Sequence, residues 1–315
     1  MEQPPIIGTR EEAVFMELRV LRYFLAVARE ESVTAAAARL HVTQPTLSKQ
    51  LMDLEKELGK KLFTRGGRKI TLTEEGLYLR NRAREIVELA DKTEEEFRAG
   101  SESIAGDVSI GAGETDGMRF LVEVMKGLRE TCPALRFHLY SGNSEDVTER
   151  LDKGLLDFGL FVGRVELKKY EYLRLPVSDT WGLFMRRDNP LARKNAVTPE
   201  DLRRIPLLCS SQALIQNELS SWLGYPFEEL SVIGTYNLIF NASLMVESGM
   251  GAAVCIDKLV NVSAGSQLCF RPFKPRFEAE LTLAWKKYQV FSAAARKFLN
   301  ELQRRLESER GSGLA

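Results

Sequence analysis

The polar residues with the most specific spacing lie in the segment TQPTLSK, from Thr43 to Lys49. Thr43 can cap a helix that begins here, and Pro45 suits its first turn, where the N–H that proline lacks would have no partner in the helix. At the start of an exposed helix, Gln44 could bond an adenine through two hydrogen bonds and Lys49 could reach a guanine. The residues expected to touch bases are Gln44, Pro45, Thr46 and Lys49.

Thr43 and Ser48 are expected to contact phosphate groups or to cap the helix. A purely structural alternative exists for Thr43 and Thr46, because threonine at a helix start is often only a cap.

The helix that carries these residues has a buried face. Its leucines are spaced four, three and four residues apart, and Gly59 ends it. A shorter helix precedes it, capped by Ser32 and continuing to Leu40, after a first helix from about Met16 to Ala28. Two helices joined by a short turn, with polar residues at the start of the second, are typical of a helix-turn-helix. The leucines of the buried face are Leu47, Leu51, Leu54 and Leu58.

Residues 61–73 predict a small hairpin around Gly66-Gly67, with Arg65 and Arg68 at its tip. These arginines should reach phosphates or the minor groove, unless they are only solvated surface charges. The chain as a whole is neutral, with 44 Lys and Arg against 44 Asp and Glu. Residues 39–69, however, contain eight basic and three acidic residues, a net charge of +5. A basic patch on a neutral chain indicates a DNA-binding module attached to a larger body.

A fourth helix is expected from Thr73 to about Ala99, with apolar residues repeating every four and three positions. This period favours a seam against a partner helix and therefore a homodimer or homotetramer, the alternative being an amphipathic helix on the chain's own body. A polar hinge, residues 101–106, follows. The seam residues are Leu79, Ala83, Ile86, Ala90, Thr93 and Phe97.

After the hinge, short apolar strands alternate with helices, which predicts a mostly parallel sheet in two α/β lobes around a cleft. Helix starts beside such a cleft offer free N–H groups, which suit anions, although Ser, Thr and Asn there can equally be caps. Asp116 argues against a simple carboxylate and for recognition of a cationic group, whereas Arg164 could anchor an anion. The candidate ligand-binding residues are Thr115, Asp116, Asn143, Ser144, Ser210, Ser211, Gln212, Tyr236 and Asn237.

Other classes of function have little support. Nucleophile-elbow, phosphate-loop and zinc-protease motifs are missing, so we expect no enzyme. With two histidines and four widely spaced cysteines, the chain predicts no metal site and no cofactor, and the cysteines are expected to be buried thiols. We find no membrane-spanning run and no secretory signal, so a cytoplasmic location is expected.

The segment from Leu18 to Gly76 resembles the DNA-binding domain of LysR-type transcription regulators. The matching motifs are Tyr23-Phe24, AAxL at 37–40, VTQPTLS at 42–48, LxxLExxLG from Leu51, where the family has Ile, LFxR at 62–65 and LTxxG at 72–76. The resemblance, which extends to about Glu307, implies a winged helix-turn-helix, a linker helix and a two-lobed effector domain like a periplasmic binding protein. The candidate ligand-binding residues would then line the cleft between the lobes.

The resemblance implies a partially palindromic operator, a small-molecule effector and contact with RNA polymerase as a possibility. A ligand-independent repressor remains an alternative, and a solute receptor for transport is opposed by the DNA module. The expected domains are a tail at 1–15, which is an extension or a misassigned start, a winged helix-turn-helix at 16–75, a linker helix at 76–100 and an effector domain at 107–310. Lobe I of this domain would comprise about 107–176 and 276–310, and lobe II about 177–275.

Overall fold

The computed structural model describes residues 16–66, 69–98, 105–163, 168–211, 218–260, 262 and 265–312. The chain divides into two compact units, Met1–Glu94 and Glu95–Ala315, and each is described by itself. Several predictions fall outside the described residues: the tail at 1–15, most of the hinge, Arg68, Arg164 and Gln212.

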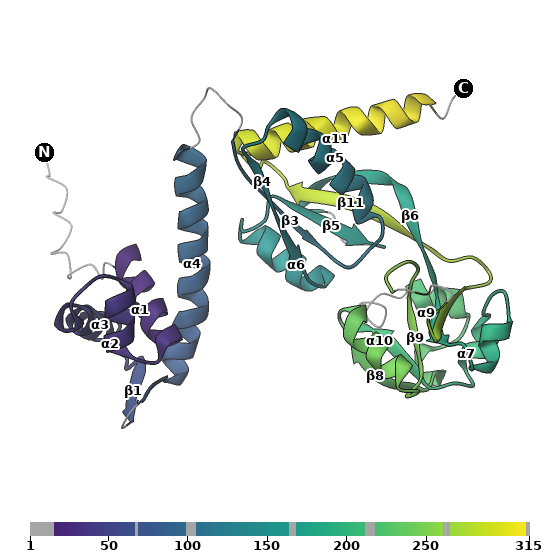
Figure 1. Cartoon of the computed structure of the whole chain (residues 1–315), viewed down its shortest axis with the longest axis horizontal. Helices are drawn as coiled ribbons and strands as arrows, with labels where there is room; N and C mark the ends of the chain where they lie inside the picture. The colour runs from purple at the N-terminus through teal and green to yellow at the C-terminus, as the bar shows by residue number, and fades with distance from the viewer. Residues whose placement is uncertain are drawn as a thin grey trace, which may run out of the picture. The chain divides into compact units, whose positions relative to one another are not determined.

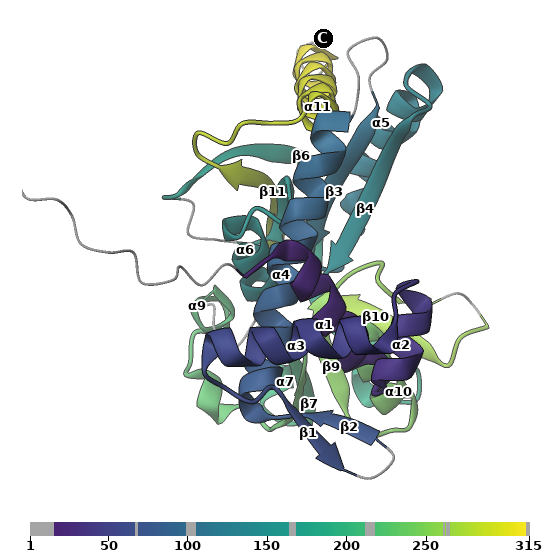
Figure 2. The ribbon, with the colours of Figure 1, turned by 90° about the vertical axis from the view of Figure 1, so that its left-hand side faces the viewer.

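The first unit is a winged helix-turn-helix. Its helices begin at the predicted caps: Ser32 Oγ accepts a hydrogen bond from Ala35 N (3.2 Å), Thr43 Oγ1 from Thr46 N (3.4 Å) and Thr73 Oγ1 from Gly76 N (3.0 Å). Figure 2 shows the hairpin extending beyond the helices. The elements are α1 (Leu18–Glu30), α2 (Val33–Arg39), α3 (Gln44–Leu58), β1 (Phe63–Gly66), β2 (Lys69–Leu72) and α4 (Glu74–Arg98).

The core of this unit gathers around the predicted leucine stripe. Leu47, Leu51 and Leu54 are buried against Phe24 of α1, while Leu58 is only half-buried at the edge of the cluster. Removing each of these side chains from water contributes roughly 1.5–3 kcal/mol. The stripe therefore fixes which side of α3 faces solvent.

The predicted seam of α4 divides into two parts. Leu79 and Ala83 are 8% and 0% exposed because they pack into the core of their own unit. Ile86, in contrast, is 41% exposed, and Leu89, which the seam pattern did not include, is 42% exposed. The prediction of a partner-facing seam is thus wrong for Leu79 and Ala83, whose apolar repeat serves the winged domain instead.

The second unit has two α/β lobes, and Figure 1 shows α5 and α11 on one side of the lobe I sheet with α6 on the other. In lobe I, β3 runs parallel to β4 and β5, and β11 is antiparallel to β5. The core centres on Phe158 and Phe298, both 0% exposed. The lobe I elements are β3 (Gly106–Ala112), α5 (Met118–Thr131), β4 (Leu135–Ser141), α6 (Ser144–Asp152), β5 (Phe158–Val162), β11 (Glu278–Lys286) and α11 (Ala293–Ser312).

In lobe II, β7 runs parallel to β8 and β9. The expected helix at 212–223 is described only from Glu218 onward. The lobe II elements are η1 (Pro190–Arg193), α7 (Pro199–Leu202), β7 (Leu207–Ser210), α9 (Glu218–Leu223), η2 (Phe227–Glu229), β8 (Val232–Tyr236), α10 (Ile239–Glu247), β9 (Ala252–Ile256) and β10 (Leu268–Pro272).

One long strand, β6 (Tyr170–Arg186), belongs to both lobes. Residues 170–180 pair with β11, whereas residues 181–186 pair with β9 and β10. Gly182 sits at the crossing to lobe II, where a Cβ atom would lie 2.4 Å from the carbonyl oxygen of Arg271. The lobes are therefore joined through a continuous hydrogen-bonded sheet.

Candidate nucleic-acid interface and ligand pocket

The first two turns of α3 present polar side chains to solvent. Gln44, Pro45, Thr46 and Lys49 are all exposed, and Ser48 is half-buried. The Thr46 hydroxyl lies 2.8 Å from the Thr43 hydroxyl, which also caps the helix. Both threonine hydroxyls are therefore engaged in capping, and the Thr46 methyl group remains available for an apolar contact.

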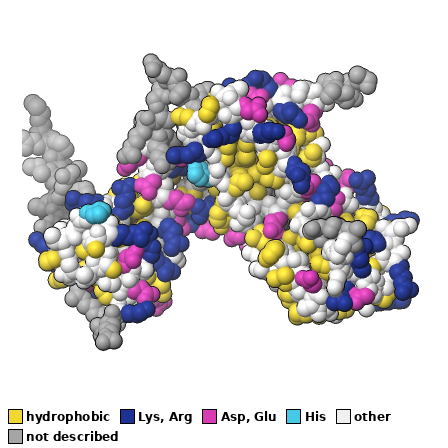
Figure 3. All heavy atoms as spheres, in the orientation of Figure 1, with side chains coloured by type: hydrophobic (Ala, Val, Ile, Leu, Met, Phe, Trp, Pro, Cys, Tyr) yellow, Lys and Arg dark blue, Asp and Glu magenta, His cyan; other side chains and the backbone are white. Residues whose placement is uncertain are grey.

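The basic residues of this unit are less concentrated than the sequence suggests. Of the eight basic residues in 39–69, four form ion pairs, and three of the four carboxylate partners lie outside this segment. Figure 3 shows Lys and Arg intermixed with Asp and Glu on the visible surface. Lys49 and Lys56 have no ion pair with any described residue, and their spacing of seven places them on one face of α3. Two lysines without a close ion-pair partner therefore lie on the outward face of α3, together with the exposed Asp53. The paired residues are Arg39, Lys60, Lys61 and Lys69.

Glu55 connects α3 to the wing. Its carboxylate accepts hydrogen bonds from Leu62 N (2.8 Å), Phe63 N (3.3 Å) and Lys61 Nζ (2.8 Å). Partial burial by itself raises the pKa of this carboxyl, but the three hydrogen bonds outweigh it and lower the pKa below 4.5. The start of β1 is thereby tied to α3. Arg65 lies on this strand, and its side chain is outside the described part.

A pocket of about 50 Å³ lies between the two lobes of the second unit. Three predicted residues, Ser210, Tyr236 and Asn237, come together in its lining from the lobe II side. Glu114 and neighbouring glycines line it from lobe I, and Trp181 of β6 also contributes. The cleft expected from the order of strands and helices is present as a pocket.

The Tyr236 hydroxyl is used structurally. It donates a hydrogen bond to the carbonyl oxygen of Val254 (2.8 Å), and burial raises its pKa well above 10. The pocket therefore meets a neutral phenol whose proton is already committed to the backbone.

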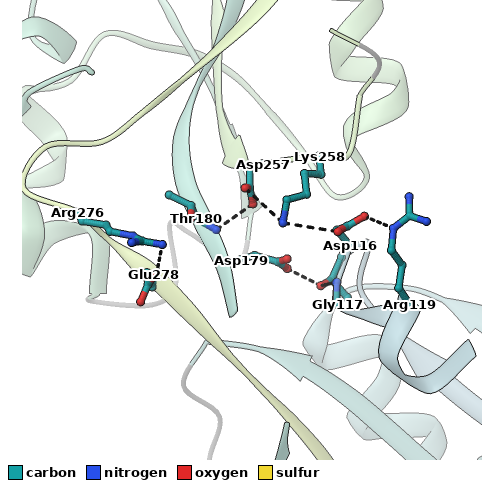
Figure 4. A network of polar contacts seen from close by, with 10 residues as sticks. Asp116, Gly117, Arg119, Asp179, Thr180, Asp257, Lys258, Arg276 and Glu278 are labelled. Atoms are coloured by element: carbon teal, nitrogen blue, oxygen red, sulfur yellow. Dashed lines mark hydrogen bonds and ion pairs between the residues drawn. The ribbon is translucent and has the colours of Figure 1, made fainter. Parts of the chain in front are cut away.

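Thr115 and Asp116 are absent from the lining of this pocket and take part in a polar network at the crossing between the lobes, in which Figure 4 shows Asp116. The buried Thr115 hydroxyl donates to Asp179 of β6. Asp116 pairs with Arg119 Nε (2.6 Å) and with Lys258 Nζ (3.6 Å) of lobe II. The positive charge expected of a ligand at Asp116 is thus supplied by the protein's own Arg119 and Lys258.

Asp179 lies at the centre of this network and is 1% exposed. Burial raises the pKa of its carboxyl, and the nearby carboxylate of Asp257 adds to the effect. Asp257 in turn accepts a hydrogen bond from Thr180 N (2.9 Å) and lies 3.7 Å from Lys258 Nζ. A pocket of about 290 Å³ borders the network.

Asn143 and Ser144 lie at the start of α6 and outside the lining of the inter-lobe pocket. Asn143 Oδ1 accepts from Asp146 N (2.8 Å), and the Asp146 carboxylate accepts from Asn143 N (3.1 Å). This reciprocal pair is a capping box, the structural alternative considered for Asn143. Ser211, directly after β7, is half-buried.

Two features of the pocket were not predicted from sequence. Glu114 Oε2 accepts a hydrogen bond from Ile239 N (2.6 Å) at the start of α10, across from lobe I to lobe II. The indole Nε1 of Trp181 is buried without a hydrogen-bond partner. The position of Glu114 directly after a strand gave a signal, whereas nothing local in the sequence marks Trp181.

The described residues contain no group of three or more side chains that could hold a metal ion. No helix in the same residues is both long and apolar enough to span a membrane. Cys209, Cys255 and Cys269 are buried, as expected, and burial raises the pKa of Cys209 to about 12. Cys132 departs from the expectation because it is only half-buried.

Two family profiles match the chain. Residues 18–77 match the bacterial regulatory helix-turn-helix protein of the lysR family, and residues 101–307 match the LysR substrate binding domain. The chain therefore belongs to the LysR family. It is a LysR-type transcriptional regulator with a DNA-binding helix-turn-helix and an effector-binding domain.

Among similar proteins, the Hca operon transcriptional activator HcaR of Escherichia coli (strain K12) is 30% identical over 302 residues, covering 93% of this chain and 99% of the relative. The crystal structure of CbnR, a LysR family transcriptional regulator, is 21% identical with a TM-score of 0.72, covering 92% of this chain and 99% of CbnR. CbnR complexed with its target DNA gives a TM-score of 0.71 at 20% identity and the same coverage. The solved structures support the two-domain fold.

Proposed function

We propose that this regulator binds a partially palindromic operator as a homodimer or homotetramer, reading bases with α3 and responding to a small effector between its lobes. The observation that carries the proposal is the outward face of α3. It combines exposed Gln44 and Lys49 with Lys56, and neither lysine forms an ion pair with a described carboxylate. The relative CbnR, solved with its target DNA, supports the same use of this fold.

Gln44, Pro45, Thr46 and Lys49 would contact bases, and Thr43 and Ser48 would position the helix on phosphate groups. Arg65 and Arg68 of the wing would reach the backbone or the minor groove. A side chain that reads a base contributes to the difference between specific and non-specific binding, whereas a phosphate contact contributes equally to both.

The test is a pair of lysine variants on the same face of α3. Lys49→Ala should weaken operator binding by about 1–3 kcal/mol, roughly five- to 150-fold, and weaken binding to unrelated DNA much less. Lys56→Ala, two turns further along, should weaken both by a similar small factor. Gel-shift titrations at fixed salt measure both constants. Equal losses on both DNAs for Lys49→Ala would contradict base reading.

Dimerisation is proposed to use the outer part of α4. Ile86 and Leu89 are exposed there, on a different face from Val87, which packs against the core of the winged domain. Ile86→Asp should lower the dimer fraction in sedimentation at micromolar concentration, since a buried carboxylate would oppose helix pairing. An unchanged sedimentation profile would move the interface elsewhere.

The inter-lobe pocket is proposed as the effector site, lined by Ser210, Tyr236 and Asn237, with Ser211, Gln212, Asn143 and Ser144 at neighbouring helix starts and Thr115 and Asp116 at the lobe crossing. Binding would favour one of two lobe arrangements and so alter DNA bending and polymerase access. A metabolite that binds only the folded chain should raise its melting temperature, by an amount equivalent to about 2.7 kcal/mol at one hundred times Kd. Promoter footprints that stay identical with such a ligand would contradict effector control.

We further infer that the chain works in the cytoplasm without catalytic activity or a cofactor, as its family membership favours. The proposed domains are those expected from the sequence: 16–75, 76–100, 101–106 and 107–310, with a tail at 1–15. Lobe I would comprise about 107–176 and 276–310, and lobe II about 177–275. Limited proteolysis of the full chain, followed by mass analysis of the fragments, would test the proposed hinge at 101–106.

A further inference from the structure

At the start of α10, Asn237 Oδ1 accepts a hydrogen bond from Leu238 N (2.9 Å), but no described side chain of the same segment bonds the N–H of Ile239. Leu238, the residue before its first turn, makes no side-chain capping bond, and the first turn holds no acidic residue. Free N–H groups and the helix dipole make such a terminus attractive to an anion. The anion that occupies it belongs to the opposite lobe: Glu114 Oε2 lies 2.6 Å from Ile239 N.

The charge of the pocket lining also disfavours an anionic ligand. Among the described residues that line it, Glu114 is the one with a charged side chain, and the others are neutral polar or apolar. A carboxylate ligand would therefore meet a negative charge and no described counter-ion in the lining. Lys258, which precedes the lining residue Leu259, is held by Asp116 and Asp257 at 3.6 and 3.7 Å.

The remaining polar groups define what a ligand can offer. Trp181 Nε1 is a buried donor without a partner, so it suits an uncharged acceptor such as a carbonyl oxygen. Glu114 Oε1 has no partner among the described residues, so it can accept a hydrogen bond from a ligand N–H or amidinium group.

We propose that Glu114 is the specificity-determining residue of the inter-lobe pocket: its carboxylate takes the anion position at the start of α10, so the pocket rejects carboxylates and accepts ligands that present hydrogen-bond donors or positive charge. The inference rests on the proposed function in that the pocket is taken as the effector site. Glu114 also links the two lobes, so a ligand that engages it acts on their contact.

The test uses three small probes of nearly equal shape: acetate, acetamide and acetamidinium. They are added to the full-length wild type and to Glu114→Ala, and melting temperatures are compared with sodium chloride at equal ionic strength. Acetate should restore the missing carboxylate in Glu114→Ala, with a saturable rise in melting temperature and a midpoint concentration at least tenfold lower than in the wild type. Acetamidinium should stabilise the wild type relative to Glu114→Ala, and acetamide, which has N–H donors but no charge, should show the same preference more weakly.

Two further variants complete the design. Glu123→Ala removes an exposed carboxylate from α5 of the same lobe and should behave as the wild type. Glu114→Gln keeps the shape of the side chain and replaces the alanine variant if that variant does not fold. Its midpoint concentration for acetate should fall between those of the wild type and Glu114→Ala. If only the wild type is available for comparison, the midpoint should lie below that of the wild type. The same acetate response in all chains, no acetate response in a folded Glu114 variant, or a wild type indifferent to acetamidinium would overturn the proposal.

The outcome is separable from that of effector control. Probe binding that follows Glu114 while no metabolite alters the promoter footprint would leave the role of Glu114 intact and remove the regulatory role of the pocket. Metabolite-dependent footprints without the acetate effect would do the reverse.

Discussion

Replacing Glu55 by alanine should destabilise the DNA-binding unit far more than replacing Glu57, its exposed neighbour on α3. Glu55 is 11% exposed at its side chain and accepts two backbone N–H bonds at the start of the wing, besides the bond from Lys61. The Lys61 pair adds little, since its ammonium group is 79% exposed and screened by water. The two amides each lose a charged acceptor, and such bonds contribute about 1.5–3 kcal/mol before water replaces part of them.

A net loss of about 2–3 kcal/mol follows, which for a unit of this size corresponds to roughly 10–20 °C in melting temperature. All three tryptophans, Trp181, Trp222 and Trp285, lie in the second unit. Far-ultraviolet circular dichroism of the full chain therefore reports both units, and tryptophan fluorescence reports the effector unit alone. In Glu55→Ala the unfolding transition of the DNA-binding unit, seen by circular dichroism, should move to lower temperature, while the fluorescence transition of the effector unit stays in place.

The pH dependence gives a second test of the same contacts. Because the folded-state pKa of Glu55 lies below its ordinary value of 4.5, its stabilising contribution is complete above that value and is lost as the pH falls through the folded-state pKa. The difference between the wild type and Glu55→Ala should shrink in that acidic range. If Glu55→Ala and Glu57→Ala unfold at the same temperature at pH 7, the wing is not held by this carboxylate.

Three other substitutions give expected outcomes by thermal denaturation. Gly76→Ala should lower the free energy of unfolding by about 1–3 kcal/mol or more, because its Cβ would lie 2.1 Å from the backbone oxygen of Leu62. Gly127→Ala, with open space around it, should raise this free energy by about 0.5–1 kcal/mol, and equal effects of the two variants would contradict the packing at Gly76. Asp179→Asn should raise the melting temperature at pH 7 but not below pH 3.8, because a carboxyl with a raised folded-state pKa costs stability when it ionises. A lower melting temperature of the variant at pH 7 would show that the charge is needed. Phe158→Ala should cost about 3–5 kcal/mol, since the ring is fully buried, and a loss under 1 kcal/mol would refute its central place in lobe I.

The sequence predicted the first unit well because its signals are local. Caps at Ser32, Thr43 and Thr73, a glycine at position 59 and the spacing of leucines in α3 each act within a few residues. The seam of α4 was partly misjudged for the opposite reason. A heptad pattern does not say which chain covers it, and Leu79 and Ala83 are covered by their own unit.

The pocket was predicted less completely because its geometry depends on residues far apart in the chain. Ser210, Tyr236 and Asn237 were found since they lie at or directly after the ends of β7 and β8, and the ends of parallel strands meet at one edge. The bond from Ile239 to Glu114 spans 125 positions, and the pair of Lys258 with Asp116 also joins the two lobes. Contacts of this kind follow from how the lobes are placed against each other, which no local pattern encodes.

The path of the chain through the two lobes also determines the order in which they can be completed during synthesis. Lobe II lies between the two stretches of lobe I, so its strands β7 to β10 are synthesised before β11. Until then β5 lacks its neighbour β11, and the lobe I core lacks Phe298 of α11. An apolar strand with an open edge is prone to pair with other chains, so the nascent protein is most exposed to aggregation in this interval. Ribosome pausing just before Glu278 would prolong that interval and lower the yield of soluble protein.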